Sequence, residues 1–300
     1  MHVGVVGGGA MGTLLAARLA AAGTDVTLFD AAPDRARTAR EGVHVEGHDP
    51  ITVPVDATTD PETARRVAVL VVAVKAHDTA DAMADADPVY DDETDVVTLQ
   101  NGLGNGETIA EYVPESNVVA GTTAHGATFL GPGRVRHAGT GPTRIGRPFA
   151  PNGERVTKIA GLLTDAGIET SVVADVRDAL WRKVAVNAGI NAATALADVD
   201  NGAMTEVCAG ERLLDAAVSE AVAVGRAAGR DLPDGVVAEA REVAAATATN
   251  VSSMRSDLRA GKRTEIEAIN GELVARGERH GVAVPVNRTL ADLVRLAERG

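Results

Sequence analysis

Apolar and polar positions alternate in blocks through the first half of the chain. The run VGVV at residues 3–6 leads through a glycine-rich turn into a helical pattern over about 10–22, and VAVLVVAV at 67–74 is a continuous β-branched run typical of a strand covered on both faces. This alternation predicts a parallel sheet with helices on both sides. Further strands are expected at 25–29, 95–100, 117–121, 123–130, 134–138, 143–146 and 169–173, and further helices from 33 and over 153–166.

From about residue 175 the pattern changes to helices almost throughout, with Gly or Pro at the joints, as at Gly229 and Pro285. A chain of 300 residues is longer than a single core usually supports. The sequence therefore predicts an α/β protein with a parallel-sheet domain over 1–170 and an all-helical domain over 171–300. The helices expected in the second half are 176–197, 210–229, 233–247, 264–280 and 287–299.

A glycine motif, Gly7-x-Gly9-x-x-Gly12, stands directly after the first predicted strand and opens the first helix. In that position Gly7 permits a tight turn, Gly9 lets the backbone approach a diphosphate, and Gly12 lets the helix pack on the sheet. The diphosphate then rests on the helix N-terminus. The motif predicts a Rossmann-type dinucleotide site made by Gly7, Gly8, Gly9, Ala10, Met11 and Gly12.

Asp30 closes the second predicted strand, about 18 residues after Gly12. A carboxylate there accepts hydrogen bonds from the adenosine ribose hydroxyls and repels a 2′-phosphate, so Asp30 favours NADH over NADPH. Two other interpretations stay open. Asp30 is also placed to cap the next helix, and Arg35 or Arg37 is near enough in sequence to reach a phosphate, so NADPH is not excluded.

The stretch WRKVAVNAGIN carries an unusual polar stripe on an otherwise apolar helical pattern. Lys183, Asn187 and Asn191 are spaced i, i+4, i+8 and therefore share one side of the helix, while Trp181 and Ile190 belong to its buried side. Asparagine is a poor residue for helix interiors, so two on one stripe indicate ligand binding. The alternative is a polar stripe that faces solvent.

Other polar residues stand at places where ligands bind in this kind of protein. Lys75 and Asn101 each follow a predicted strand, at the carboxyl edge of the sheet, although a strand-end charge and a simple Asn-Gly turn explain them equally well. In the helical half, Asn201 lies in DNG, and Ser253 and Glu265 lie where they can equally cap a helix or favour its dipole.

Composition narrows the function classes. The formal net charge of −13 opposes binding to nucleic acid or to an anionic membrane. The acidic excess, an aromatic content of only 2% with a core therefore built from small side chains, and a set of only four lysines predict adaptation to a high-salt cytoplasm, where charge repulsion is screened.

The single cysteine, Cys208, has no partner for a disulfide or a thiolate metal site, which fits a reducing cytoplasm, and it is expected to be buried. No metal is expected. The N-terminal segment is apolar, but four glycines by residue 9 and Arg18 argue against a signal peptide or membrane helix. We expect a cytoplasmic protein with a small-molecule substrate, as a monomer or homodimer.

On these motifs the chain resembles the ketopantoate reductases (2-dehydropantoate 2-reductases). The matching blocks span nearly the whole chain, and the two longest, in the helical half, are distinctive. They are GGGAMG at 7–12, VAVKAHD at 72–78, QNGLG at 100–104, GTTAHGA at 121–127, LWRKVAVNAGINAATAL at 180–196, NVSSMRSDLRAGKRTEIEAINGEL at 250–273 and HGVAVPVN at 280–287.

The resemblance implies reduction of 2-dehydropantoate to (R)-pantoate with NAD(P)H, on the route to pantothenate and coenzyme A. Members that use NADPH commonly carry a basic residue where this chain reads LFDAAP, so the resemblance leaves the cofactor choice to Asp30. It also implies roles for individual residues. Lys183 would be the proton donor, Asn187, Asn191, Asn201 and Ser253 would hold substrate, Asn101 would lie between cofactor and substrate, and Lys75, Ala127 and Glu265 would contact cofactor.

A ketone that receives a hydride develops negative charge on its oxygen, and an ammonium group such as that of Lys183 can stabilise and protonate it. Partial burial would lower the pKa of Lys183 toward working pH. Two alternatives remain. One is a reductase of another branched 2-oxo acid, and the other is a dinucleotide sensor without turnover.

Overall fold

The computed structural model describes residues 1–299, which form two compact units. The first unit comprises Met1–Gln100 and Asn105–Val176, and the second comprises Asn101–Gly104 and the chain from Arg177 onward. The short segment Asn101–Gly104 therefore belongs with the helical half, although it lies within the first half of the sequence.

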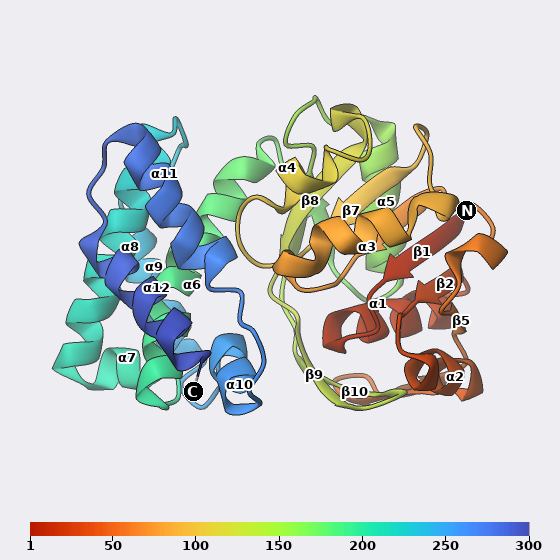
Figure 1. The fold of residues 1–300 in the computed structure, drawn as a ribbon, viewed down its shortest axis with the longest axis horizontal. Helices are drawn as coiled ribbons and strands as arrows, with labels where there is room; N and C mark the ends of the chain where they lie inside the picture. The colour runs from red at the N-terminus through yellow and green to blue at the C-terminus, as the bar shows by residue number, and fades with distance from the viewer. Residues whose placement is uncertain (300) are drawn as a thin grey trace. The chain divides into compact units, whose positions relative to one another are not determined.

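The first unit is built on an eight-stranded sheet (Figure 1). Its strands are β1 (His2–Val6), β2 (Asp25–Phe29), β5 (Asp56–Thr58), β6 (Val69–Val72), β7 (Asp95–Thr98), β8 (Val118–Thr123), β11 (Thr143–Gly146) and β12 (Thr170–Val172). In the order β12-β11-β8-β7-β6-β1-β2-β5, every neighbouring pair is parallel except β8 and β11. The strand order reverses between β1 and β6, which is where open sheets of this kind bind ligands.

The buried strands are rich in β-branched residues because both faces of the sheet are covered. The apolar runs in β1, β6, β7 and β8 are buried along their whole lengths apart from His2 at the start of β1. The helices of this unit are α1 (Ala10–Ala21), α2 (Pro33–Glu41), α3 (Thr79–Asp85), α4 (Asn105–Ile109) and α5 (Glu154–Asp165), with the 3₁₀ turns η1 (Pro61–Thr63), η2 (Ala76–Asp78), η3 (Asp87–Val89) and η4 (Glu115–Asn117).

A second, four-stranded sheet covers α1 (Figure 1). Its strands are β3 (Val43–Gly47), β4 (Ile51–Val53), β9 (Gly126–Gly131) and β10 (Arg134–Gly139), in the order β4-β3-β10-β9. The sequence predicted β9 and β10 but not β3, β4 or β5, because these three strands are short and stand in a polar segment. Covered by the sheet, α1 is buried along most of its length, Arg18 included.

A buried chain of polar side chains joins α1 to this second sheet. Arg18 Nη2 donates to His137 Nδ1 at 3.1 Å, and His137 Nε2 lies 2.8 Å from His125 Nδ1. Because a guanidinium only donates, His137 Nδ1 carries no proton, so Nε2 of His137 donates to His125. Burial first, and then the charge of Arg18, lowers the pKa of both histidines. Both effects favour the neutral form of the two rings.

The regular secondary structure of the second unit is helical (Figure 1). Its elements are α6 (Val176–Ala197), α7 (Ala203–Glu206), α8 (Cys208–Ala227), α9 (Val236–Ala246), α10 (Ser253–Arg259), the π-helical turn η5 (Glu267–Gly271), α11 (Glu272–His280) and α12 (Pro285–Ala297). Trp181 and Ile190 of α6 are buried in the apolar core of this unit, as predicted, and Val184, Leu214 and Leu273 are buried with them. The predicted fold, a parallel-dominated sheet followed by a helical half, is confirmed.

Two expectations for the second half are corrected. A single helix is predicted at 264–280, but η5 interrupts the helical pattern there, and the structure adds α10, which the sequence pattern does not predict. Cys208 was expected to be buried but is exposed, because it is the first residue of α8. Within residues 1–299 no helix is both long and apolar enough to cross a membrane.

Candidate active site

The glycine motif forms a close turn between β1 and α1. Gly7 has a φ of +103°, in the region that favours glycine, and a β-carbon on Gly12 would lie 1.9 Å from the carbonyl oxygen of Gly7. A β-carbon on Gly9, by contrast, would meet no atom of the described chain within 4 Å. Gly9 therefore presents open space beside the first turn of α1, where Ala10 and Met11 lie partly buried. These features fit a diphosphate cradle.

Asp30 lies against this motif at the end of β2. Its side chain is buried, Oδ1 accepts a hydrogen bond from the amide of Ala32 at 2.7 Å, and Oδ2 lies 3.4 Å from Arg35 Nη1. Oδ2 accepts no hydrogen bond from any described residue. A buried carboxylate oxygen in this state has capacity for a ligand hydroxyl, which fits an adenosine ribose.

Arg35 is held close to both groups. Its Nη1 donates to the carbonyl oxygen of Gly8 at 3.3 Å, and its guanidinium lies over the ring of Phe129, 5.9 Å from the centroid. The capping alternative for Asp30 is not seen: its carboxylate accepts from the amide of Ala32, which is itself the N-cap residue of α2, and α2 has no side-chain cap hydrogen bond.

The other two residues predicted to contact cofactor in the first unit lie on different segments of it. Lys75 follows β6, is half-buried, and precedes the 3₁₀ turn η2. Ala127 lies in β9, partly buried, and pairs with His137 of β10. Lys75 thus follows the carboxyl end of a strand of the main sheet, as ligand-binding residues do in this architecture, whereas Ala127 belongs to the second sheet.

The polar stripe of the second unit lies on α6. Lys183 and Asn187 are half-buried and Asn191 is buried, so the stripe does not simply face solvent. The long helix α6 keeps all three residues on one side, at successive turns. The alternative of a solvent-facing stripe does not fit their burial.

Glu265 and Asn101 lie with Lys183 in the second unit. The Glu265 side chain is buried, and its Oε2 accepts a hydrogen bond from Asn101 Nδ2 at 3.2 Å. Part of the Lys183 side chain reaches solvent, but its ammonium group lies among protein atoms, and this loss of hydration lowers the pKa of Lys183 to about 8. The Glu265 carboxylate acts in the opposite sense and favours the charged ammonium.

Asn201 and Ser253 lie at a junction of short segments near the C-terminal end of α6. Asn201 is buried, and its Nδ2 donates to Thr247 Oγ1 at 3.0 Å, while its Oδ1 has no partner among the described residues. Ser252, not Ser253, caps α10: its Oγ accepts from the amide of Arg255 at 3.3 Å. Ser253 is exposed at the first turn of that helix.

The junction is held by buried polar contacts. Thr194 Oγ1 of α6 lies 2.9 Å from Ser252 Oγ, and Arg255 donates to the carboxylates of Asp198 and Asp200. Paired with Arg259 and Arg255, the Asp198 carboxyl has a pKa lowered to about 2. These contacts tie the turn that carries Asn201 to α10, which carries Ser253.

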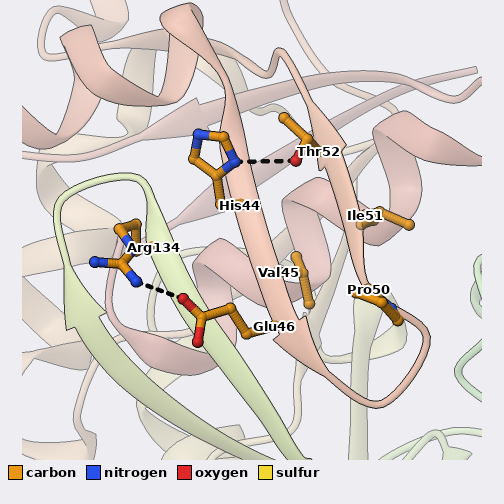
Figure 2. A pocket seen from close by; sticks show the side chains of 7 residues that line it. All are labelled: His44, Val45, Glu46, Pro50, Ile51, Thr52 and Arg134. Carbon is orange, nitrogen blue, oxygen red and sulfur yellow. Dashed lines mark hydrogen bonds and ion pairs between the residues drawn. The ribbon is translucent and has the colours of Figure 1, made fainter.

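A surface hollow of about 500 Å³ on the first unit holds none of the predicted site residues (Figure 2). On its walls His44 Nδ1 lies 2.9 Å from Thr52 Oγ1, and Arg134 pairs with Glu46 at 2.5 Å. The hydrogen bond from Arg134 lowers the pKa of Glu46. The hollow is therefore lined by charges that already neutralise each other, and we assign no site to it.

The part of the chain that the structure describes contains no cluster of His, Cys, Asp or Glu side chains suited to a metal ion. The sequence singled out the residues that come together in each unit: Gly8 and Asp30 in the first, and Lys183, Asn101 and Glu265 in the second. It did not single out Thr194 or Arg255, whose contacts join segments far apart in sequence.

Comparison with known proteins identifies the family. Residues 3–148 match the family model of ketopantoate reductase PanE/ApbA, and residues 175–298 match that of its C-terminal domain. A 2-dehydropantoate 2-reductase of Halobacterium salinarum is 48% identical over 303 residues, covering 100% of this chain and 99% of that relative.

Solved structures agree. A PanE/ApbA family ketopantoate reductase from Ralstonia eutropha JMP134 has a TM-score of 0.91 and 32% identity, covering 100% of this chain and 99% of that one. The ternary structure of D-mandelate dehydrogenase with NADH and anilino(oxo)acetate has a TM-score of 0.93 at 23% identity, covering 100% and 99% of the two chains, which shows a shared fold. The chain belongs to the ketopantoate reductase family.

Proposed function

We propose that this chain reduces 2-dehydropantoate to (R)-pantoate, with NADH as the favoured hydride donor, in pantothenate and coenzyme A biosynthesis. The observation that carries the proposal is the group formed by Lys183, Glu265 and Asn101 in the second unit. A lysine with a pKa near 8 beside a carboxylate is suited to giving up and regaining a proton near neutral pH.

When bound, the nicotinamide supplies a hydride to the ketone carbon of the substrate. The ammonium of Lys183 stabilises the negative charge that develops on the ketone oxygen and then donates a proton to it. Glu265 keeps Lys183 charged in the resting enzyme, against the effect of burial. Asn101, hydrogen-bonded to Glu265, keeps the carboxylate in place.

The remaining polar residues of the second unit hold the substrate in this proposal. Asn187 and Asn191 extend the side of α6 that carries Lys183, and each amide can donate and accept without adding charge. The buried, unpartnered Oδ1 of Asn201 has capacity for a substrate hydroxyl, and the exposed Ser253 can donate to a carboxylate. Fixing both ends of the substrate brings the ketone into a reactive geometry.

Preference for NADH rests on Asp30. Its Oδ2 is buried without a hydrogen bond from the described residues, so it can accept a hydrogen bond from a ribose hydroxyl. The negative charge of the same carboxylate would repel a 2′-phosphate. Lys75, Ala127, Glu265 and the motif residues complete the set of residues that we assign to cofactor binding. We assign cofactor binding to 1–170 and substrate binding to 171–300.

Steady-state reduction of 2-dehydropantoate with NADH and NADPH in parallel tests the proposal. We expect turnover with both and a lower KM for NADH. A clear preference for NADPH would remove Asp30 from its assigned role, and Arg35 would then be the residue that meets the phosphate.

A second substrate class deserves a parallel assay, because D-mandelate dehydrogenase has the same fold. The alternative is reduction of another branched 2-oxo acid, and a panel of 2-oxo acids followed by NADH absorbance decides between them. A sensor without turnover would bind NADH but oxidise none of it with any member of the panel. The same preparation, measured by light scattering, distinguishes a monomer from a homodimer.

The proposed setting is a salt-rich cytoplasm. The net charge of −13 and the 48% identity to a protein of Halobacterium salinarum support it. Activity assays at low and high KCl therefore belong in the same experiment.

A further inference from the structure

The helix after Glu265 opens with a π-helical turn, η5. Within it the amide of Gly271 donates to the carbonyl oxygen of Ile266 at 2.9 Å, whereas the amide of Ile269 is shared between the carbonyls of Glu265 and Ile266. A π turn adds one residue to a helix, so the residues before it are rotated about the axis relative to those after it, and such turns are frequent at functional sites. The direction of Glu265 is therefore set by η5.

The polar side chain inside this turn, Asn270, is fully buried. Its Nδ2 donates to Asn287 Oδ1 at 2.9 Å and lies 3.4 Å from the carbonyl oxygen of Ala188 in α6. Asn287 Nδ2 in turn donates to Glu220 Oε2 at 2.8 Å and to the carbonyl oxygen of Ala217 at 2.9 Å. One continuous network thus joins η5 to α6, α8 and α12.

The contact with Ala188 reaches the active-site helix directly. Ala188 follows Asn187 and lies between the turns of α6 that carry Lys183 and Asn191. The buried Asn270 amide therefore fixes the position of α6 along its own axis relative to η5, and so relative to Glu265. A buried amide that loses such partners costs about 1–3 kcal/mol, which holds the arrangement in one register.

The same turn also positions Asn101. The carbonyl oxygen of Ala268 in η5 accepts a hydrogen bond from the amide of Leu103 at 2.8 Å. Gly102, with a φ of +95°, packs so closely that a β-carbon there would lie 2.5 Å from the same carbonyl oxygen. The segment Asn101–Gly104 thus packs against η5. Its first residue, Asn101, contacts Glu265, which lies just before η5 in the chain.

We infer that Asn270 is a positioning residue: through η5 it sets the separations among Lys183, Glu265 and Asn101. Each of the three groups is connected to η5 in a different way. Lys183 lies on α6, which contacts Asn270 at Ala188; Glu265 lies two residues before η5 in the chain; and Asn101 lies in the segment whose Leu103 donates to Ala268. The inference rests on the proposed role of Lys183 as proton donor. Asn270 itself touches none of the reacting atoms in this assignment.

Asn270→Leu tests it, because leucine fills a similar volume and cannot donate to Ala188 or Asn287. We expect kcat for 2-dehydropantoate reduction to fall by about 10²-fold with KM for NADH unchanged, since a displacement of about 1 Å at the site costs that much. The control is Asn117→Leu, which removes another buried amide, one that donates to the carbonyl of Asp92 at 2.6 Å in the first unit.

A second readout needs no turnover. The chain has only four lysines, Lys75, Lys158, Lys183 and Lys262, so isotope-labelled lysine side chains give a simple spectrum in which Lys183 can be titrated. Displacing Glu265 removes the charge that favours the ammonium, so we expect the titration midpoint of Lys183 to move to lower pH in Asn270→Leu and to stay unchanged in Asn117→Leu.

A merely structural role would lower Tm in both variants while leaving kcat and the Lys183 midpoint as in the wild type, and that result would overturn the inference. If Asn270→Leu does not fold, Asn270→Ser, which shortens the side chain and loses both contacts, takes its place under the same criteria. A wild type that titrates as expected but does not reduce 2-dehydropantoate would refute the proposed function and leave the positioning role standing.

Discussion

The carboxylate of Asp30 occupies the space in which any residue other than glycine at position 8 would carry its β-carbon. A β-carbon built on Gly8 would lie 1.8 Å from Asp30 Oδ2, whereas one built on Gly9 would meet nothing in the described chain within 4 Å. The adjacent residues Gly8 and Gly9 are therefore glycines for different reasons. Gly8 makes room for a protein carboxylate, and Gly9 leaves room for a ligand.

The two glycines should respond differently to the same substitution. In Gly8→Ala the new methyl group displaces Asp30, and we expect a loss of about 1–3 kcal/mol in the free energy of unfolding, as for other overpacked sites, together with weaker NADH binding. In Gly9→Ala we expect nearly normal stability and a KM for NADH raised about tenfold or more. Thermal unfolding and NADH titration measure both.

An exposed glycine in the middle of α5, Gly161, provides the matched control. Gly161→Ala has open space for its methyl group and should stabilise the protein by about 0.5–1 kcal/mol without changing KM for NADH. Unaltered NADH binding in Gly9→Ala would remove the diphosphate from the space beside that residue.

Removing the Lys183 ammonium should affect the chemical step and spare the cofactor. We expect Lys183→Ala to lower kcat for 2-dehydropantoate reduction by about 10²–10⁴-fold, the usual contribution of a general acid, while the Kd for NADH stays near that of the wild type. Lys262→Ala, which removes an exposed lysine from the same unit, is the control. Near-normal turnover in Lys183→Ala would exclude this lysine as the proton donor.

The pH profile should report the same residue. Lysine donates a proton only from its charged form, which predominates below its pKa, so reduction is expected to decline as pH rises through about 8. Oxidation of pantoate needs the neutral amine and should rise over the same range. Glu265→Gln removes the charge that raises the pKa of Lys183, so the pH at which reduction declines should be lower in this variant than in the wild type.

Pantoate oxidation and 2-dehydropantoate reduction, each followed from pH 6 to 10, supply this measurement. A limb that stays in place in Glu265→Gln would show that another group titrates.

How much of this site could be read from the sequence differs between its parts. The bounds predicted for α6, 176–197, are those observed, because the segment is rich in alanine and leucine and contains no proline that would interrupt a helical periodicity. The polar stripe with Lys183 followed from that periodicity alone. The contact between Asn101 and Glu265 joins residues 164 positions apart, and no local pattern specifies it.

At η5 the local pattern predicts a continuous helix that the structure does not have. The sequence of η5, EAING, continues the helical pattern, and a single helix was the reasonable expectation. The contacts made by this turn are tertiary: the buried Asn270 amide lies between Ala188 and Asn287, and the carbonyl oxygen of Ala268 accepts a hydrogen bond from the amide of Leu103. Strands β3, β4 and β5 were missed for a related reason, since partner strands rather than local alternation stabilise such short segments.

Mild acid should destabilise the first unit through its buried histidines. The pKa of His125 and that of His137 are below the ordinary 6.5, so below pH 6.5 the unfolded chain binds more protons than the folded one and stability falls as pH decreases. We expect Tm to drop by a few degrees between pH 7 and 5. His137→Gln should have a flatter profile, whereas His280→Gln, at an exposed position, should follow the wild type.

Tm against pH, measured at constant high KCl, tests this. An identical slope in wild type and His137→Gln would assign the acid sensitivity to carboxylates instead.

Salt should stabilise the protein through its net charge. With a formal charge of −13, the folded chain repels itself more than the expanded chain does, and this repulsion is screened when the Debye length falls from about 10 Å at 0.1 M to about 3 Å at 1 M. Buried pairs such as Arg147 and Asp95, at 2.6 Å, are screened much less and keep their contribution. We therefore expect Tm and the half-life of activity to rise steeply from 0.1 M to 2 M KCl. Sucrose is the control, because it carries no charge and stabilises proteins only by being excluded from their surface. Equal stability at low and molar KCl would contradict the proposed adaptation.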